Sequence, residues 1–86
     1  MFEITFTPFA KKDLQRLSPE IQKRIIKKLK FFSSQKNPLL FSKPLVNIPP
    51  STHRFRVGDY RVTFYIKGKV MHIQRMNHRR EIYGDY

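Results

Sequence analysis

Hydrophobic and polar residues alternate along four parts of the chain, which we expect to form strands. The runs cover residues 2–6, 53–57, 60–66 and 70–76, and the alternation is poor in the last of them. A period of two is typical of a strand that buries one face and exposes the other. Gly58 and Gly68 lie in the two gaps between the last three runs, where a tight turn favours glycine. This part of the sequence therefore predicts an antiparallel meander of three strands.

Between the first two runs, apolar residues recur at helical spacing. Thr7-Pro8 and Ser18-Pro19 each place a capping hydroxyl before a proline at the first helical position. We expect a first helix of about three turns and a second over residues 19–35, joined as a hairpin. The second helix is amphipathic. Its apolar side holds Ile21, Ile25, Ile26, Leu29 and Phe32, and its basic side holds Lys23, Arg24, Lys27, Lys28 and Lys30.

Residues 36–51 contain four of the six prolines and show no period. We expect a loop that crosses the domain surface, anchored by Leu39, Leu40, Leu45 and Ile48. A chain of 86 residues has room for one domain, so we assign residues 1–86 to a single domain. The predicted fold class is α+β, with an N-terminal strand, a helical hairpin and a three-strand meander. These strands form one sheet, and the helices pack on one of its faces.

Alternation also predicts which side chains share a face of the meander. Arg54 and Arg56 point to the side opposite their apolar neighbours, and Arg61 and Tyr65 of the next strand point to the same side. A solvated strand face accounts equally well for Arg54 or Arg56 alone. A charge at the centre of a sheet is costly without a partner, however, and adjacent guanidinium groups repel. The cluster therefore indicates an anion-binding face.

The charge balance points to the same kind of ligand. The chain has 18 Lys and Arg residues against 6 Asp and Glu residues, a formal net charge of +12. This excess favours a polyanionic partner such as a nucleic acid. No apolar run reaches the ~20 residues of a membrane span, and the N-terminus lacks the pattern of a signal peptide. We therefore expect a cytoplasmic protein that has no membrane partner.

The residue types exclude several kinds of catalytic site. The chain has no cysteine, so thiol catalysis and cysteine-ligated metals are excluded. The three histidines lack the spacing of a helical metal pair, and the scattered acids offer no carboxylate pair for a glycosidase or a two-metal nuclease. We expect neither a metal nor a cofactor.

Arginines beside a tyrosine and a histidine suit the cleavage of RNA. RNA carries its own nucleophile, the 2′-hydroxyl. A cleavage site must take that proton, stabilise charge on the phosphorane and protonate the departing 5′-oxygen. Arginine suits the second task because it is permanently charged and fork-shaped. Histidine titrates near neutral pH, so His78 is our candidate for proton transfer.

Three phrases are recognisable together: FEITFTPFAKKDLQRL, KPL followed by HRFRVGDYRVTFYI, and HRREIY. They resemble the opening strand and helix, the central hairpin and the C-terminal signature of the RelE/ParE superfamily of bacterial and archaeal type II toxins. The resemblance covers nearly the whole chain. It implies a ribosome-dependent mRNA endoribonuclease, and a small acidic or amphipathic antitoxin that wraps its basic surface.

The resemblance also implies roles for individual residues. Arg61 stabilises the scissile phosphate, Arg79 contacts phosphate and is implicated in protonating the leaving group, and Tyr83 orients the target nucleotide or acts as a base. Arg54 and Arg56 hold the RNA backbone. We expect further RNA contacts from Arg80, Lys27 and Lys28.

Other functions stay open at this point. A ParE-like toxin inhibits DNA gyrase by binding it and needs no catalytic tyrosine. A plain RNA-binding module would use the sheet as a charged platform, with stacking aromatic residues that are few in this sequence. A degenerate toxin would keep only the interaction with its antitoxin.

Overall fold

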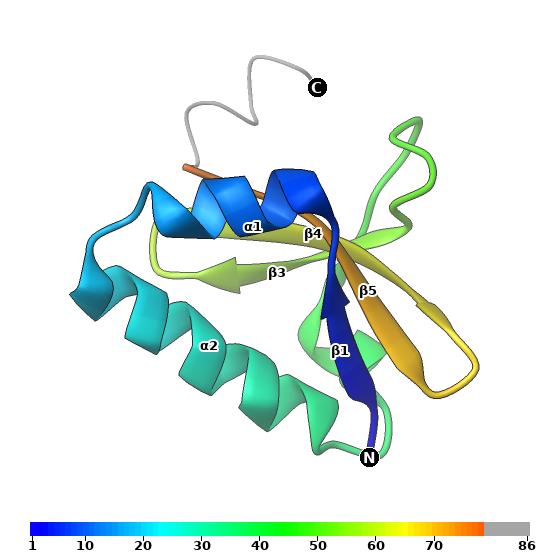
Figure 1. Ribbon diagram of the computed structural model, residues 1–86. Coiled ribbons are helices and arrows are strands. Elements are labelled where there is room, and N and C mark those ends of the chain that lie inside the picture. The colour runs from blue at the N-terminus through cyan, green and yellow to red at the C-terminus, as the bar shows by residue number, and fades with distance from the viewer. Residues whose placement is uncertain (79–86) are drawn as a thin grey trace.

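The computed structural model describes residues 1–78 of the chain. Five strands form one sheet, and two helices cover one face of it (Figure 1). In chain order the elements are β1 (Glu3–Phe6), α1 (Pro8–Gln15), α2 (Pro19–Ser33), the 3-10 helix η1 (Pro38–Phe41), β2 (Lys43–Pro44), β3 (His53–Val57), β4 (Tyr60–Lys67) and β5 (Val70–His78). The predicted α+β fold is confirmed.

The strands lie in the order β1-β5-β4-β3-β2. The predicted meander is present, because β3, β4 and β5 pair antiparallel in succession. The N-terminal strand β1 joins the sheet beside β5 and runs parallel to it. The two helices and η1 connect β1 to β2 at the opposite edge of the sheet. Gly58 and Gly68 occupy the two tight turns with φ angles of 59° and 61°, a conformation in which most other residues are strained.

Both helices begin at the expected capping residues. The Thr7 hydroxyl accepts a hydrogen bond from the Ala10 amide at 3.0 Å, and the Ser18 hydroxyl accepts one from the Ile21 amide at 3.4 Å. The expected length of the first helix is wrong, because α1 has eight residues. Ser18 adopts an extended backbone before Pro19, since proline disfavours a helical residue in front of it. The second cap therefore ends the first helix early.

The core lies between α2 and the sheet. Ile25 and Leu29 of α2 are fully buried. Phe32 stacks on Phe55 of β3, and Phe55 stacks on Phe64 of β4, both with ring centroids 4.1 Å apart. Close-packed aromatic side chains bury more apolar area than any other residue type. This stack therefore fixes α2 against the centre of the sheet.

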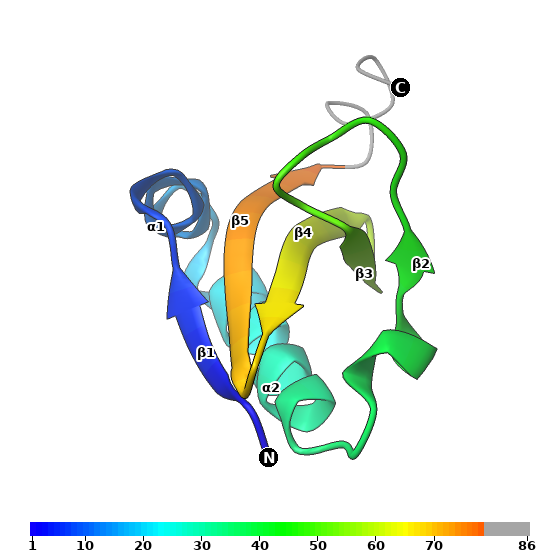
Figure 2. The ribbon, with the colours of Figure 1, turned by 90° about the vertical axis from the view of Figure 1, so that its right-hand side faces the viewer.

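Helix α1 covers the part of β5 that extends beyond β1 (Figure 2). At the start of this part, the Thr7 amide donates to the Ile73 carbonyl at 3.0 Å and the Thr7 hydroxyl donates to the Gln74 carbonyl at 2.7 Å. Further along, the Met76 amide donates to the Asp13 carboxylate at 2.9 Å. An exposed strand edge leaves backbone groups without partners, and α1 supplies those partners where β1 ends.

Asp13 is the charged centre of this contact. Its side chain is 2% exposed and accepts hydrogen bonds from Arg75 at 2.8 Å and Arg16 at 2.6 Å. Burial alone raises the pKa of Asp13. The hydrogen bonds from Arg75, from the Met76 amide and from Arg16 outweigh burial, so the pKa of this carboxyl lies below its ordinary value.

The segment over residues 36–51 is more ordered than predicted. It contains η1 and the short strand β2, and β2 pairs with the start of β3. The Leu45 amide continues this pairing by donating to the Thr52 carbonyl at 2.8 Å. The expected anchoring by Leu40 is wrong, because that side chain is 79% exposed. Leu39, Leu45 and Ile48 are half-buried, as an anchoring role requires.

A bulge in β5 explains why hydrophobic and polar residues alternate poorly over residues 70–76. Phe64 pairs with Ile73 and Thr63 pairs with Arg75, so Gln74 is an extra residue in β5. The bulge moves the next core residue to Met76, three positions after Ile73.

Within residues 1–78, neither helix is long and apolar enough to cross a membrane.

Candidate functional site

The sheet face turned away from the helices gathers three of the predicted site residues. Arg56 of β3 lies directly opposite Arg61 of β4, and Arg54 lies opposite Thr63. Directly opposed side chains in an antiparallel pair have Cβ atoms about 5 Å apart. Residues 61 and 63 share one face of β4 by alternation. The structure thus places Arg54, Arg56 and Arg61 together; we call them the arginine face.

Arg61 is the central residue of the arginine face. It is only 4% exposed, whereas Arg56 is exposed and Arg54 is half-buried. Asn77 of β5 lies directly across from Arg61 on the other side. A guanidinium buried between another guanidinium and an amide lies in a region of low dielectric, where its attraction for an anion is strongest. The arginine face is therefore suited to binding a phosphate group.

Carboxylates lie away from the three arginines in the described part of the chain, although Glu3 of β1 lies on the same face of the sheet, two residues before Thr5, which pairs with His72. Asp13 contacts Arg16 and Arg75 at the edge of β5. Asp59 is exposed in the turn between β3 and β4, and Glu20 is exposed at the start of α2. Among residues 1–78, no three His, Asp or Glu side chains come close enough to hold a metal ion.

The structure does not bring His78 together with Arg61. His78 pairs with Tyr60, and their rings meet edge to face at 5.3 Å. Tyr60 is a neighbour of Arg61 in β4, so its side chain points to the opposite face, toward the helices. His78, Tyr60 and Asp13 line a cavity of about 320 Å³ beside α1. The candidate for proton transfer thus lies on the helix side of the sheet.

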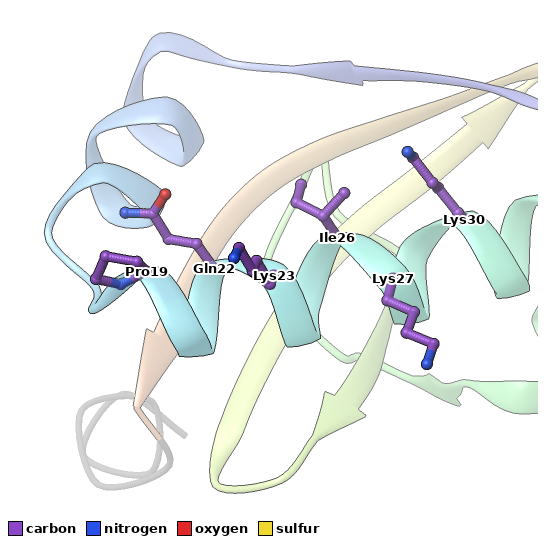
Figure 3. Close-up of a pocket in the computed structure, with 6 residues that line it drawn as sticks. All are labelled: Pro19, Gln22, Lys23, Ile26, Lys27 and Lys30. Carbon is purple, nitrogen blue, oxygen red and sulfur yellow. The ribbon is translucent and has the colours of Figure 1, made fainter.

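Lys27 and Lys28 also lie apart from the arginine face. Both side chains are exposed on α2, the helix that covers the other face of the sheet (Figure 2). Lys27 borders a groove of about 430 Å³ along α2, which is also lined by Pro19, Gln22, Lys23, Ile26 and Lys30. Figure 3 shows Ile26 between Gln22 and Lys30, while Lys27 points away from them. The groove combines an apolar centre with ammonium groups around it.

Three predicted site residues, Arg79, Arg80 and Tyr83, lie outside the described residues. Sequence reasoning missed Asn77 as the neighbour of Arg61. His72 was not among the predicted site residues either, although it stacks on Tyr65 on the same side of the sheet as the arginine face. In the sequence, the apolar residues Ile73 and Met76 are three positions apart instead of two. This spacing indicates the bulge at Gln74, which determines how β5 pairs with β4.

The fold of a five-stranded sheet with two helices on one face is shared with toxins from type II toxin–antitoxin systems. The family model described as ParE toxin of type II toxin-antitoxin system, parDE, matches residues 4–83. The chain is 31% identical over 84 residues to toxin RelG of Mycobacterium tuberculosis, and the matched region covers 95% of each chain. The protein belongs to the RelE/ParE superfamily of these toxins.

Solved structures have the same fold. The toxin–antitoxin complex RelBE2 of Mycobacterium tuberculosis contains a chain with a TM-score of 0.74 and 30% identity, covering 91% of both chains. The archaeal RelE–RelB complex of Pyrococcus horikoshii contains one with a TM-score of 0.72 and 23% identity, covering 91% of this chain and 94% of that one. The resemblance inferred from the three sequence phrases is therefore confirmed.

Proposed function

We propose that this toxin is a metal-independent endoribonuclease that cleaves mRNA in the ribosomal A site by attack of the RNA 2′-hydroxyl. The observation that supports this most directly is the placement of Arg61, which is nearly inaccessible and lies between Arg56 and Asn77. Opposed like charges destabilise a sheet. A phosphate bound between the guanidinium groups offsets their repulsion. RNA as the ligand therefore accounts for the clustering of these arginines.

Catalysis then depends on charge stabilisation in a preorganised site. Arg61 donates to a non-bridging oxygen of the scissile phosphate, where negative charge grows as the 2′-oxygen attacks. Arg54 and Arg56 bind flanking phosphates and set the register of the RNA. Preorganised donors cost no reorganisation during the reaction. Arg61 therefore accelerates the chemical step, whereas the other two arginines act mainly on binding.

Proton transfer is assigned to residues that follow β5 in the chain. Asn77 lies opposite Arg61, so the described part of β5 ends beside the proposed phosphate site. This supports Arg79 as the group near the leaving 5′-oxygen and Tyr83 as the group that orients the nucleotide or takes the 2′-proton. His78 lies with Tyr60 on the helix side of the sheet, away from Arg61, so it is not assigned a part in proton transfer. Arg80 is proposed as a further phosphate contact. The ribosome supplies the RNA already positioned, so naked RNA should be cleaved slowly.

Primer extension on mRNA from cells that express the protein tests this proposal. The wild-type chain should arrest growth and produce cuts within codons. Removing one preorganised donor should slow cleavage by about 100- to 1,000-fold, so the cuts should vanish with Arg61→Ala. Arg24→Ala is the matched control, because it removes an exposed arginine from α2. Cuts that persist in Arg61→Ala would contradict the proposal.

A second candidate function is gyrase inhibition without nuclease activity. The description of the matching family model favours it, because that model names the ParE toxin. By contrast, two relatives with at least 30% identity are toxin RelG and a chain of the RelBE2 complex. Accumulation of cleaved gyrase–DNA complexes in cells whose messages stay intact would decide for this alternative. In-codon cuts with normal gyrase activity would decide against it.

We propose a cognate antitoxin as the protein partner, as in the RelBE2 and RelE–RelB complexes. The net charge of +12 and the lysine-bordered groove on α2 favour a small partner with acidic and apolar residues. Lys27 and Lys28 would then contact this partner in place of RNA. Binding to the folded state alone raises stability, so the partner should raise the melting temperature. An unchanged melting temperature with the product of the neighbouring gene would count against it.

A further inference from the structure

The face that carries the arginines also carries an aromatic pair. Tyr65 of β4 and His72 of β5 are direct cross-strand neighbours, and their rings stack with centroids 4.6 Å apart at 16°. Both side chains are half-buried. Tyr65 lies four residues from Arg61 on the same face of β4, about 13 Å along the strand. A strand of a few nucleotides can span that distance.

The orientation of the pair is fixed from one side. The Thr5 hydroxyl of β1 lies 3.1 Å from Nδ1 of His72, within hydrogen-bond distance, which sets the plane of the imidazole. His72 covers one face of the Tyr65 ring. Within residues 1–78, no second aromatic ring contacts Tyr65. The phenol ring is thus held in place while one of its faces has no aromatic neighbour in the described structure.

Cations lie on both sides of this ring along the same face of the sheet. Arg61 lies on one side, and Lys67, exposed at the end of β4, lies two residues beyond Tyr65 on the other. Single-stranded RNA is bound by this combination of phosphate-binding cations and aromatic rings on which bases stack. Tyrosine and histidine both serve as stacking residues in RNA recognition.

We propose that the Tyr65–His72 pair is a stacking platform for a base of single-stranded RNA, separate from the cleavage position at Arg61. The base extends the stack on the face of Tyr65 that points away from His72. Its nucleotide lies a few steps along the strand from the phosphate at Arg61. The inference rests on the proposed function in that RNA is the ligand, and it adds a second contact that holds the RNA in register. Because the rings are already ordered, stacking costs little conformational entropy.

A cross-strand aromatic pair also stabilises a sheet without any ligand, so the test must separate binding from folding. The probe is a fluorescent RNA of about eight nucleotides, methylated at every 2′-oxygen so that the 2′-hydroxyl cannot attack. Fluorescence anisotropy gives the dissociation constant for the wild-type protein and for each variant. Tyr65→Leu should weaken binding by about 5- to 100-fold, while Tyr65→Phe, which keeps the ring, should bind like the wild type.

Two matched controls remove aromatic rings elsewhere. Phe31→Leu changes an exposed ring on α2, and His53→Leu changes a half-buried imidazole on the helix side of β3. Neither control should change RNA affinity. The salt dependence adds a further distinction. Tyr65→Leu should leave the slope of log affinity against log salt unchanged, whereas Arg54→Ala should reduce it by about one.

A series of RNAs with one abasic position each tests the platform even where a variant fails to fold. One abasic position should weaken binding to the wild-type protein, and that same position should have no effect on Tyr65→Leu. Equal binding of all abasic RNAs by the wild type would refute the platform, and so would a Tyr65→Leu variant with unchanged affinity. A Tyr65→Leu variant that loses only antitoxin binding would assign the pair to a protein contact and would also refute the platform.

Cleavage on ribosomes is measured separately from RNA binding. Absence of in-codon cuts would reject the nuclease function, while an effect of one abasic position that depends on Tyr65 would still establish the platform.

Discussion

Asp13 offers a sharp test of how α1 is held to the sheet. Its carboxylate is 2% exposed and accepts hydrogen bonds from the Met76 amide, from Arg75 and from Arg16. Asp13→Ala removes the acceptor and leaves the buried Met76 amide without its partner. A buried donor that loses its partner costs about 1–3 kcal/mol. The loss should therefore be large for a single surface helix.

The ion pairs add less than the backbone contact. The Arg75 side chain is 46% exposed and the Arg16 side chain 70% exposed, so each pair is partly screened by solvent and contributes about 0.2–1 kcal/mol. Together with the Met76 contact, the expected loss in Asp13→Ala is about 1.5–5 kcal/mol. In a domain of this size, each kcal/mol lost lowers the melting temperature by about 4–8 °C.

Urea and thermal unfolding followed by circular dichroism measure this loss. Asp59→Ala is the control, because it removes the same charge from an exposed turn and should cost far less. Asp13→Asn keeps an oxygen for the Met76 amide and should be intermediate. The folded pKa of Asp13 is lowered, so its charge stabilises the fold fully above the unfolded value of about 4. That contribution disappears as the pH falls through the folded pKa. Equal stability of Asp13→Ala and Asp59→Ala would refute the reasoning.

Three further changes test the core, a turn and the arginine face by the same unfolding measurements. Phe55→Ala should lower the free energy of unfolding by about 3–5 kcal/mol, whereas Phe31→Ala, at an exposed ring, should cost much less; equal losses would contradict the stacked core. Gly68→Ala places a Cβ at φ 61° in open space and should cost about 1 kcal/mol; no loss would show that the turn relaxes. Arg56→Gln removes the repulsion of Arg61 and should raise stability by about 0.2–1 kcal/mol. This gain should disappear in 1 M salt, and a gain that persists in high salt would contradict an electrostatic origin.

Local patterns were sufficient for most of the fold. The capping pairs at Thr7-Pro8 and Ser18-Pro19 gave both helix starts, because a cap depends only on residues within one turn. Alternation gave the faces of β3 and β4, because a strand without a bulge keeps its period over its whole length. The shared face of Arg54, Arg56 and Arg61 followed from this period and from the two-residue turn at Gly58.

Contacts between distant segments could not be predicted in this way. β1 and β5 lie far apart in the chain, so no local pattern encodes their pairing. Asp13 looks like a solvated helix residue in the sequence, since its main partners lie more than sixty residues away. The bulge at Gln74 was visible only as poor alternation. The residue that lies opposite Arg61 depends on this bulge, and it could be identified only from the pairing of β4 with β5.

The same bulge determines what the far side of the sheet can do. Without the extra residue in β5, the partners of Thr63 and Arg61 would shift by one position, and residues of opposite facing would exchange places. With it, Asn77 lies across from Arg61 while His72 still lies across from Tyr65. His78, one residue further, consequently lies with Tyr60 on the helix side. The sheet therefore presents guanidinium groups and one aromatic pair on the face that we propose binds RNA, and it directs the imidazole of its last strand residue toward α1.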